Sequence, residues 1–597
     1  MESASLKRTE ALLARLYGAR AGAVAERLAA LVDACAERLG TRRDPAPSAP
    51  PGVGEVMLIS YGDSIGTEGE APLATLGRFL DRHARGTVTA VHILPMYPST
   101  SDDGFSVSDY RMVDPELGDW EDVAELARGY ELMFDAVVNH ASVSNPWFRA
   151  FLRGEAPYGR FFAKAREGAD YSSVVRPRAL PLFTPFETSR GRELVWTTFS
   201  ADQADLDFSE PEVLLAVLDT LLFYAERGAR YLRLDAVGFV WKEEGTSCLN
   251  LPGAHAIVKL ARLALDAAGS GTRIITETNV PHDENVAYFG EGDEAGLVYQ
   301  FPLPPLVLHA FLSGSAERLG AWIASLGATA LPSGCAWFNF LASHDGIGLR
   351  PTEGILDDAG RDALVRATLE RGGRVGYRSA ADGSRSPYEL NINYLDALSP
   401  PEADDGGRAD RMCAAHAILL ALDGMPGIYV HSLLGSRNWS AGVEESGIAR
   451  RINREKLDLA ALEAELAGDG LRARVSSRLL AMIRVRRDLP AFAPGSPQAV
   501  IALDPRVLAL ARGAPGNRVL ALANVSGDAF TLEVPWGSFD AISGEFVDRP
   551  RVTLAPYQAR WLLESAPADP EGATRHAAGA AASSRGGEGR GEPGSAS

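Results

Sequence analysis

The stretch RYLRLDA, from Arg230 to Ala236, decides the fold that this sequence predicts. It is expected to form a buried strand, and it carries Arg233 and Asp235 at its end. Similar short apolar runs occur at residues 55–60, 88–94, 132–138, 273–277, 296–301, 336–341 and 427–430. Most gaps between the runs are long enough for a helix. Eight such runs alternating with helices predict an α/β fold, a (β/α)8 TIM barrel with a parallel sheet.

The rest of the chain is organised around this barrel. The gaps after the third and seventh runs, 141–215 and 346–410, are too long for ordinary barrel loops, and we expect the first to be an inserted domain that helps build a substrate site. Leu, Val and Ala recur at helical spacing over 6–39, before a Pro-rich linker, 41–54. Short alternating runs after about residue 490 predict an antiparallel β domain. The expected divisions are 1–50 (helical extension and linker), 51–485 (catalytic barrel, with the insertion at about 141–215), 486–565 (β domain) and 566–597 (disordered tail).

Composition excludes several classes of partner. The net charge of −19 disfavours nucleic acid and anionic membrane surfaces, which both require basic patches. There is no apolar run of about 18 residues and no secretory h-region. The cysteines, Cys35, Cys248, Cys335 and Cys413, are far apart, so we expect reduced thiols and a cytoplasmic protein. No metal or other cofactor is expected, because the insertion lacks a cluster of oxygen ligands. Two roles are open for the N-terminal helices: packing on the barrel, or mediating a homodimer.

Polar residues stand at the ends of four of the predicted strands. Because the carboxyl ends of barrel strands meet in one cavity, we expect these side chains to converge there. They are Asp135, Asn139 and His140 after the third run, Arg233 and Asp235 after the fourth, Glu277 after the fifth, and His344 and Asp345 after the seventh.

Three carboxylates in one cavity indicate chemistry on a glycosidic bond. Retaining cleavage uses a carboxylate nucleophile and a carboxylic acid about 5–5.5 Å apart. Asp235 is then the candidate nucleophile, held ionised by a neighbouring arginine, and Glu277 the candidate acid. Asp345 would stabilise the distorted sugar. Each segment alone is as well explained by an internal salt bridge or a turn; their order on successive strands is what favours function.

Four segments resemble the signature segments of the α-amylase superfamily, glycoside hydrolase family 13. They are DAVVNH (135–140), GARYLRLDAVG (228–238), ITE (275–277) and FLASHDG (340–346). The resemblance covers roughly residues 51–565. It implies the same barrel and the same roles for the three carboxylates, and it implies that His140, Arg233 and His344 contact the glucosyl unit.

Further segments are similar to the sucrose phosphorylase subfamily: PSTSDDGFSVSDY (98–110), VRPRALPLF (175–183) and DAVGFVWKEEGTSC (235–248). The resemblance implies that Asp102 and Arg454 hold the far hydroxyls of glucose and that Phe105 forms an apolar platform. It also implies that Arg178 and Tyr388 bind phosphate, which suits the guanidinium fork of an arginine. Gln203 is expected to face the acceptor, with Asp202, Asp205 and Asp207 shaping the edge of the site.

Departures from that subfamily lie on the acceptor side. Phe239 replaces a usual tyrosine, and Glu389 a usual glutamine. ITETNVPHDENVAYFG (275–290) and NFLASHDGIGLRPTEGIL (339–356) resemble a sister group, the glucosylglycerate phosphorylases, whose leaving group is D-glycerate. A carboxylate-bearing acceptor needs a cationic pocket, for which the candidates are Lys242, His282 and Arg350.

The expected activity is therefore that of a retaining glucoside phosphorylase. It would convert 2-O-(α-D-glucopyranosyl)-D-glycerate and phosphate to α-D-glucose 1-phosphate and D-glycerate by double displacement. The alternatives are a sucrose phosphorylase, a related α-glucoside hydrolase or transglucosylase, and a non-catalytic sugar-binding relative. The last usually lacks a catalytic carboxylate, whereas this chain keeps all three.

Overall fold

A closed barrel of eight parallel strands forms the centre of the molecule in the computed structural model, which describes residues 3–44, 47, 49–178, 180–327, 329–379, 385–547 and 550–566. The strands are β1 (Met57–Ser60), β3 (Ala90–Ile93), β4 (Glu131–Val137), β9 (Ala229–Asp235), β10 (Arg273–Thr276), β11 (Leu297–Tyr299), β12 (Ala336–Phe340) and β16 (Met425–Tyr429). Each falls on one of the predicted runs, so the predicted fold class is confirmed. The predicted tail, beyond Ala566, lies outside the described residues.

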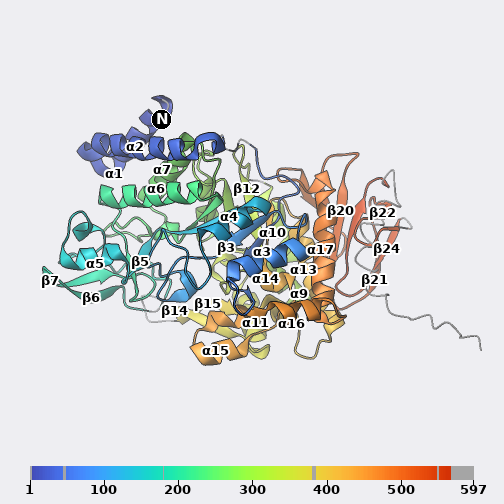
Figure 1. Cartoon of the computed structure of the whole chain (residues 1–597). Helices are drawn as coiled ribbons and strands as arrows, with labels where there is room; N and C mark the ends of the chain where they lie inside the picture. Colours follow the sequence, from blue (N-terminus) through green and yellow to red (C-terminus); the bar gives the residue numbers. More distant parts are fainter. Residues whose placement is uncertain are drawn as a thin grey trace, which may run out of the picture.

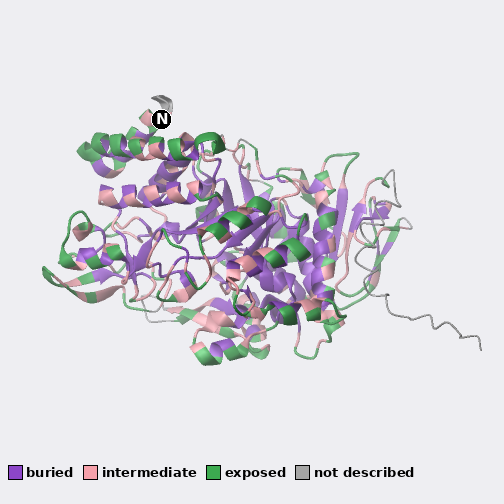
Figure 2. Cartoon of the chain, in the orientation of Figure 1, coloured by how far each residue is buried: buried purple, intermediate pink, exposed green. Residues whose placement is uncertain are grey.

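Strand register brings the polar residues of neighbouring strands side by side. In the β4–β9 pair, Asp135 is opposite Arg233, and Val137 is opposite Asp235. In the β9–β10 pair, Leu234 is opposite Thr276, which places Glu277 just beyond that level. Most other residues of the barrel strands are apolar and buried, as Figure 2 shows for the centre of the molecule. The cluster of Asp135, Arg233, Asp235 and Glu277 therefore lies towards the carboxyl ends of the strands, whereas Glu131, Arg230 and Arg273 stand near the amino ends.

Helices surround the barrel (Figure 1). The main ones are α3 (Pro72–His83), α4 (Trp120–Gly129), α6 (Pro211–Glu226), α7 (Pro252–Ala268), α9 (Leu303–Ser313), α10 (Glu317–Leu326), α13 (Asp405–Ala421) and α17 (Leu471–Arg487). Local sequence fixes their starts: Asp119 and Asp122 form a capping box on α4, and Pro211 and Pro252 stand in the first turns of α6 and α7. Within the described part of the chain, none of the helices combines the length and apolar character needed to cross a membrane.

Two insertions rise from the carboxyl ends of the strands. The first follows β4, as predicted, and contains β5 (His140–Ser142), α5 (Pro146–Arg153), β6 (Phe183–Thr188), β7 (Gly191–Trp196) and β8 (Gln203–Asp205). The pairing of β5 with β8 sets His140 opposite Asp205, and Ser142 opposite Gln203. The second follows β12 and contains β13 (Ile347–Gly348), α11 (Asp358–Glu370), β14 (Arg374–Ser379) and β15 (Arg385–Asn391).

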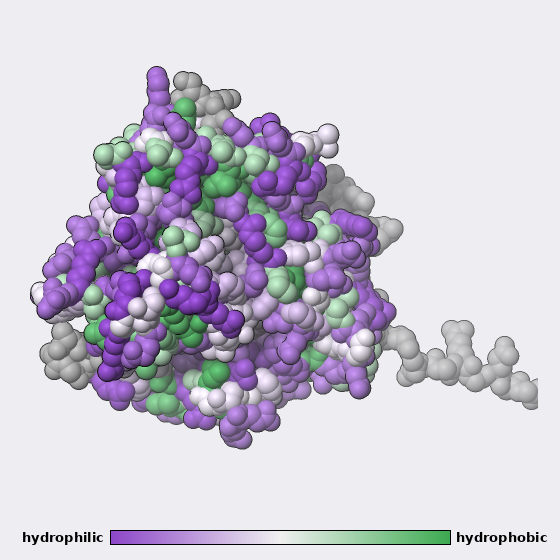
Figure 3. All heavy atoms as spheres, turned by 60° about the vertical axis from the view of Figure 1, so that its left-hand side comes forward, coloured by the Kyte–Doolittle hydropathy of each residue, from purple (hydrophilic) through white to green (hydrophobic). Residues whose placement is uncertain are grey.

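Each end of the chain forms a further part of the structure outside the barrel, a helical hairpin at the N-terminus and an antiparallel sheet at the C-terminus. At the N-terminus, α1 (Ser3–Tyr17) and α2 (Ala21–Leu39) pack on α6 and α7. Tyr17 donates to the carbonyl of Phe208 (2.9 Å), and Arg38 pairs with Glu226 (2.7 Å), so the hairpin packs on the barrel. At the C-terminus, an antiparallel sheet runs β18 (Gln498–Val500), β19 (Val507–Arg512), β20 (Val519–Asn524), β25 (Ala559–Leu563), β22 (Phe539–Asp540) and β23 (Glu545–Phe546), beside a pair formed by β21 (Phe530–Glu533) and β24 (Arg551–Leu554). The face seen in Figure 3 is mostly hydrophilic, with hydrophobic residues in small groups.

Candidate active site at the carboxyl ends of the barrel strands

A pocket of about 420 Å³ opens where the strands end and the two insertions meet. Its walls come from the strand ends, the first insertion and the β14–β15 hairpin. Of the twelve residues given a catalytic, substrate-binding or phosphate-binding role from sequence, eleven line it: Asp102, Phe105, His140, Arg178, Gln203, Arg233, Asp235, Glu277, His344, Asp345 and Tyr388. The exception is Arg454. Residues far apart in the chain thus share one cavity.

Arg233 lies at the centre of the carboxylate cluster. Its Nη1 donates to Asp235 Oδ1 (2.9 Å) and also to Asp135, whose other oxygen is hydrogen-bonded to His92 Nε2 (2.7 Å). The nearest approach of Arg233 to Glu277 is 4.0 Å, from Nη2 to Oε2. Asp235 is therefore the carboxylate of the pair that the guanidinium contacts directly.

The carboxyl groups of Asp235 and Glu277 both have pKa values raised above their usual range by burial. Burial raises the pKa of Glu277 to about 7, and the negative charges of Asp235 and Asp345 act in the same direction. Burial also raises the pKa of Asp235 to about 7, and the charge of Arg233 opposes that shift. We assign the protonated form to Glu277 and the ionised form to Asp235, because the hydrogen bond from Arg233 favours the ionised form of Asp235.

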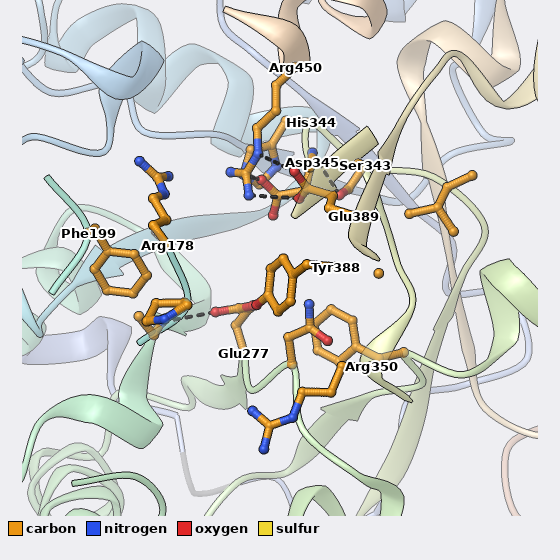
Figure 4. A pocket seen from close by; sticks show the side chains of 18 of the residues that line it. Arg178, Phe199, Glu277, Ser343, His344, Asp345, Arg350, Tyr388, Glu389 and Arg450 are labelled. Carbon is orange, nitrogen blue, oxygen red and sulfur yellow. Dashed lines mark hydrogen bonds and ion pairs between the residues drawn. The ribbon is translucent and has the colours of Figure 1, made fainter. Parts of the chain in front are cut away.

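Asp345 is held in its charged form. Enclosure in the pocket alone would raise its pKa, but the charges of Arg450 and other nearby cations outweigh that effect and lower it well below its usual range. Arg450 pairs with Asp345 and also, through Nη2 and Nε, with the two carboxylate oxygens of Glu389 (2.8 and 3.2 Å). The three side chains lie together in Figure 4. Arg450 was not predicted from sequence.

The residues expected at the glucosyl unit gather beside Asp345. Phe105 stacks on His344 with ring centroids 4.8 Å apart, and its carbonyl accepts from His140 Nε2 (2.9 Å). Gln203 donates to Asp102 Oδ2 and to the carbonyl of Phe105, both at 3.3 Å. Gln203 therefore stands with the expected glucose-binding side chains, rather than apart from them on an acceptor side.

Arg454 does not line the pocket and contacts Asp103 instead. Its Nη1 donates to Asp103 Oδ2 (2.5 Å), and its Nη2 stays 4.0 Å from Asp345 Oδ1. The sequence-based expectation paired Arg454 with Asp102 on the same hydroxyls, but Asp102 instead pairs with Arg178 (2.9 Å). The 3-10 turn Ala449–Asn453 turns Arg450, not Arg454, towards the cavity.

The backbone that carries Asp102 and Phe105 is strained. Asp102 and Asp103 both have left-handed φ values, 56° and 46°, followed by Gly104 at 107°. Such a conformation costs a residue other than glycine about 1–3 kcal/mol, so the surroundings must hold it. Asp103 supplies that hold: Oδ1 accepts from Arg451 Nη2 (2.6 Å), and Oδ2 accepts from Arg454. Asp103 is thus a positioning residue for the wall that faces Asp345.

We expect Asp103→Asn to weaken substrate binding more than chemistry. Asparagine keeps one acceptor oxygen but no negative charge, so this variant loses both ion pairs and one charge-assisted hydrogen bond worth about 1.5–3 kcal/mol. That loss should loosen this wall and raise KM for the glucoside by about 10-fold or more, with a smaller change in kcat. Steady-state kinetics measure the split, and Asp219→Asn, which removes a surface partner of Arg111, is the matched control. An equal loss in kcat and in stability, with KM unchanged, would assign Asp103 a purely structural role.

Of the three residues predicted to bind the acceptor, only one lines the pocket. Lys242 forms an ion pair with Asp205 (2.8 Å) and donates to Asn139, and it does not line the pocket. His282 packs near Trp337 and does not line the cavity. Arg350 lines the pocket, as do Tyr388 and Asn279. Asn279 was not predicted from sequence.

Known proteins are similar to this chain in both sequence and fold. The family described as alpha amylase, catalytic domain, matches residues 85–345, and a D-apionate lactonase C-terminal immunoglobulin-like domain matches 504–562. A glucosylglycerate phosphorylase of Allomeiothermus silvanus is 49% identical over 92% of this chain and 97% of its own length. One of Escherichia coli is 45% identical over 85% and 91%. The crystal structure of sucrose 6F-phosphate phosphorylase from Thermoanaerobacter thermosaccharolyticum superposes with a TM-score of 0.69 at 26% identity, over 84% of this chain and 97% of that one.

Proposed function

We propose an activity for a chain that belongs to the glucosylglycerate phosphorylase family of the α-amylase superfamily: it converts 2-O-(α-D-glucopyranosyl)-D-glycerate and phosphate to α-D-glucose 1-phosphate and D-glycerate. The family membership predicted from sequence is confirmed by identities of 45–49% to three glucosylglycerate phosphorylases over most of their length. That similarity is the observation that carries the proposal, and the pocket supplies groups suited to each step.

The first step forms a glucosyl ester on Asp235. Among the described residues, Arg233 contacts only Oδ1 of this carboxylate, so we assign the attack on the anomeric carbon to Oδ2. The bond from that carbon to the glycerate oxygen breaks as Glu277 gives its proton to the leaving oxygen. Asp345 and the side chains around it hold the glucosyl hydroxyls and stabilise the positive charge that develops on the ring.

The second step transfers the glucosyl group to phosphate. A phosphate oxygen attacks the anomeric carbon, the ester bond to Asp235 breaks, and Glu277 takes back a proton from the incoming phosphate. Two inversions give net retention, so the product is the α-phosphate. Phosphate is anionic at neutral pH and needs less help from a base than water does. We propose Arg178 and Tyr388 among its ligands, since both line the cavity that contains Glu277.

A panel of α-glucosides tests the proposed substrate. Purified enzyme is given phosphate with glucosylglycerate, sucrose, glucosylglycerol or sucrose 6′-phosphate, and glucose 1-phosphate is measured. We expect the highest kcat/KM with glucosylglycerate. Preference for sucrose would replace the substrate but keep the two-step mechanism, whereas no turnover of any glucoside would remove the proposal altogether.

We also propose that the enzyme works in the cytoplasm. The four cysteines are free and buried, far from one another in sequence, which suits a reducing compartment. Fusion to a fluorescent protein, followed by fractionation of the cells that make it, locates the enzyme.

A further inference from the structure

Arg350 stands out among the charged side chains that line the pocket. Arg178 pairs with Asp102, Arg233 with Asp235, Arg378 with Glu353 and Arg450 with Glu389. Arg176, which is exposed to solvent, donates to a backbone carbonyl. The side chain of Arg350 has no ion pair or hydrogen bond with any residue that the structure describes, and its Nε is buried. A partly buried cation without a partner suits a ligand that brings its own negative charge.

The position of Arg350 fits the side of the pocket where the leaving group departs. Arg350 begins the short turn Arg350–Thr352, and the preceding residue, Leu349, donates its N–H to the carbonyl of Tyr388 (3.0 Å). In Figure 4, Asp345 and Arg450 lie on one side of Glu277 and Tyr388, and Arg350 lies on the other. If the glucosyl unit sits against Asp345, the group bonded through the oxygen beside Glu277 points towards Arg350.

A second unpartnered group lies on the same wall. The amide oxygen of Asn279 is buried without a hydrogen-bond partner among the described residues, and its side chain packs against Gly348, two residues before Arg350. The wall thus offers a guanidinium for an anion and an amide oxygen for a hydroxyl. A small hydroxy acid carries both complementary groups, whereas a neutral polyol or ketose has no group that satisfies the guanidinium charge.

From this geometry we propose that Arg350 is the anion-binding residue of the acceptor site and serves both half-reactions: it binds the carboxylate of the leaving hydroxy acid first, and then the incoming phosphate. This inference rests on the proposed function and adds to it the residue that selects a negatively charged acceptor. Arginine pairs bidentately with carboxylate and with phosphate, so one side chain suits both anions in turn. Arg178, proposed above as a further phosphate ligand, already pairs with Asp102, whereas the side chain of Arg350 has no partner among the described residues.

Glucosylglycerol is the substrate that isolates the carboxylate, because it has the same skeleton with a hydroxymethyl group in its place. We expect Arg350→Gln to lower kcat/KM for glucosylglycerate by about 10- to 100-fold, the range for a lost hydrogen bond to a charged group, and to leave kcat/KM for glucosylglycerol within about 3-fold. Arg350→Lys, which keeps the charge but not the fork, should fall between the two. Equal losses on both substrates, or none on either, would overturn the carboxylate role.

The role of Arg350 in binding phosphate is measured with glucosylglycerol, the neutral glucosyl donor. With glucosylglycerol as substrate, the KM for phosphate should rise by about 10-fold or more in Arg350→Gln. An unchanged phosphate KM would overturn the shared site. Arg374→Gln, an exposed arginine of β14 that does not line the pocket, is the matched control and should change neither quantity. If wild-type enzyme does not phosphorolyse glucosylglycerate at all, the proposed function has failed; if it does and the variant keeps the wild-type preference, only the role of Arg350 has failed.

Discussion

Replacing Asp235 with alanine is expected to abolish phosphorolysis, lowering kcat by about 10⁴-fold or more, the scale seen when an enzyme loses the group that forms its covalent intermediate. The reason is geometric. Asp235 is the carboxylate that Arg233 contacts at 2.9 Å, and it stands at the end of β9, in the wall of the pocket that also contains Glu277 and Asp345. Glucose 1-phosphate release under saturating substrate measures the loss.

A small anion should restore part of that activity. In Asp235→Ala, azide can enter the space left by the side chain and attack the anomeric carbon from the same face. The product would be β-glucosyl azide, formed by a single inversion while Glu277 still protonates the leaving oxygen. Rescue with this product shows that the variant is folded and that only the nucleophile is missing. Turnover within about 10-fold of wild type without azide would remove Asp235 from the mechanism.

Glu277→Gln is expected to have the second-largest effect, and the effect should depend on the leaving group. Loss of a positioned general acid lowers rates by about 10²- to 10⁴-fold, so kcat/KM for glucosylglycerate should fall in that range. Fluoride leaves without a proton, so formation of the glucosyl enzyme from α-glucosyl fluoride should stay near the wild-type rate. Rapid-quench measurement of that step tests the assignment. Equal losses with both donors would mean that Glu277 acts on something other than the leaving oxygen.

The same residue sets an expected pH dependence. Glu277 must carry its proton in the first step, and burial raises its pKa to about 7, so the required form is present below that pH and lost as the pH rises through it. We expect kcat/KM of the wild-type enzyme for glucosylglycerate to decline on the alkaline side with an apparent pKa near 7. With α-glucosyl fluoride this decline should be absent. A decline of equal size with both donors would assign it to another group.

The barrel was predictable because its strands have a strong local signal. Each is a short apolar run buried on both faces, and helices of ordinary length separate them. The small strands β22 (Phe539–Asp540) and β23 (Glu545–Phe546) were not predicted, since two residues cannot show an alternating pattern. β22 pairs with β25, and β23 pairs with β22, contacts that only the folded sheet provides.

The site was predictable at the level of strand ends and not at the level of partners. Asp235, Glu277 and Asp345 follow buried runs, and the barrel geometry brings such positions together. The segment IARRINR (448–454) contains three arginines, and nothing in the sequence distinguishes the one that faces the pocket. The structure turns Arg450 towards Asp345 and Glu389, and it pairs Arg451 and Arg454 with Asp103. The strained backbone of Asp102 and Asp103 likewise left no sequence signal, because positive φ is uncommon for any residue other than glycine, even though aspartate tolerates it better than most.

The central claim is that phosphate, not water, receives the glucosyl group with retained configuration. The most direct measurement follows the reaction of glucosylglycerate by NMR, with and without phosphate. The account predicts α-D-glucose 1-phosphate as the first product, formed in proportion to the glycerate released, and only slow release of glucose when phosphate is left out. Free glucose released equally fast without phosphate, or the β-anomer of the phosphate, would contradict it.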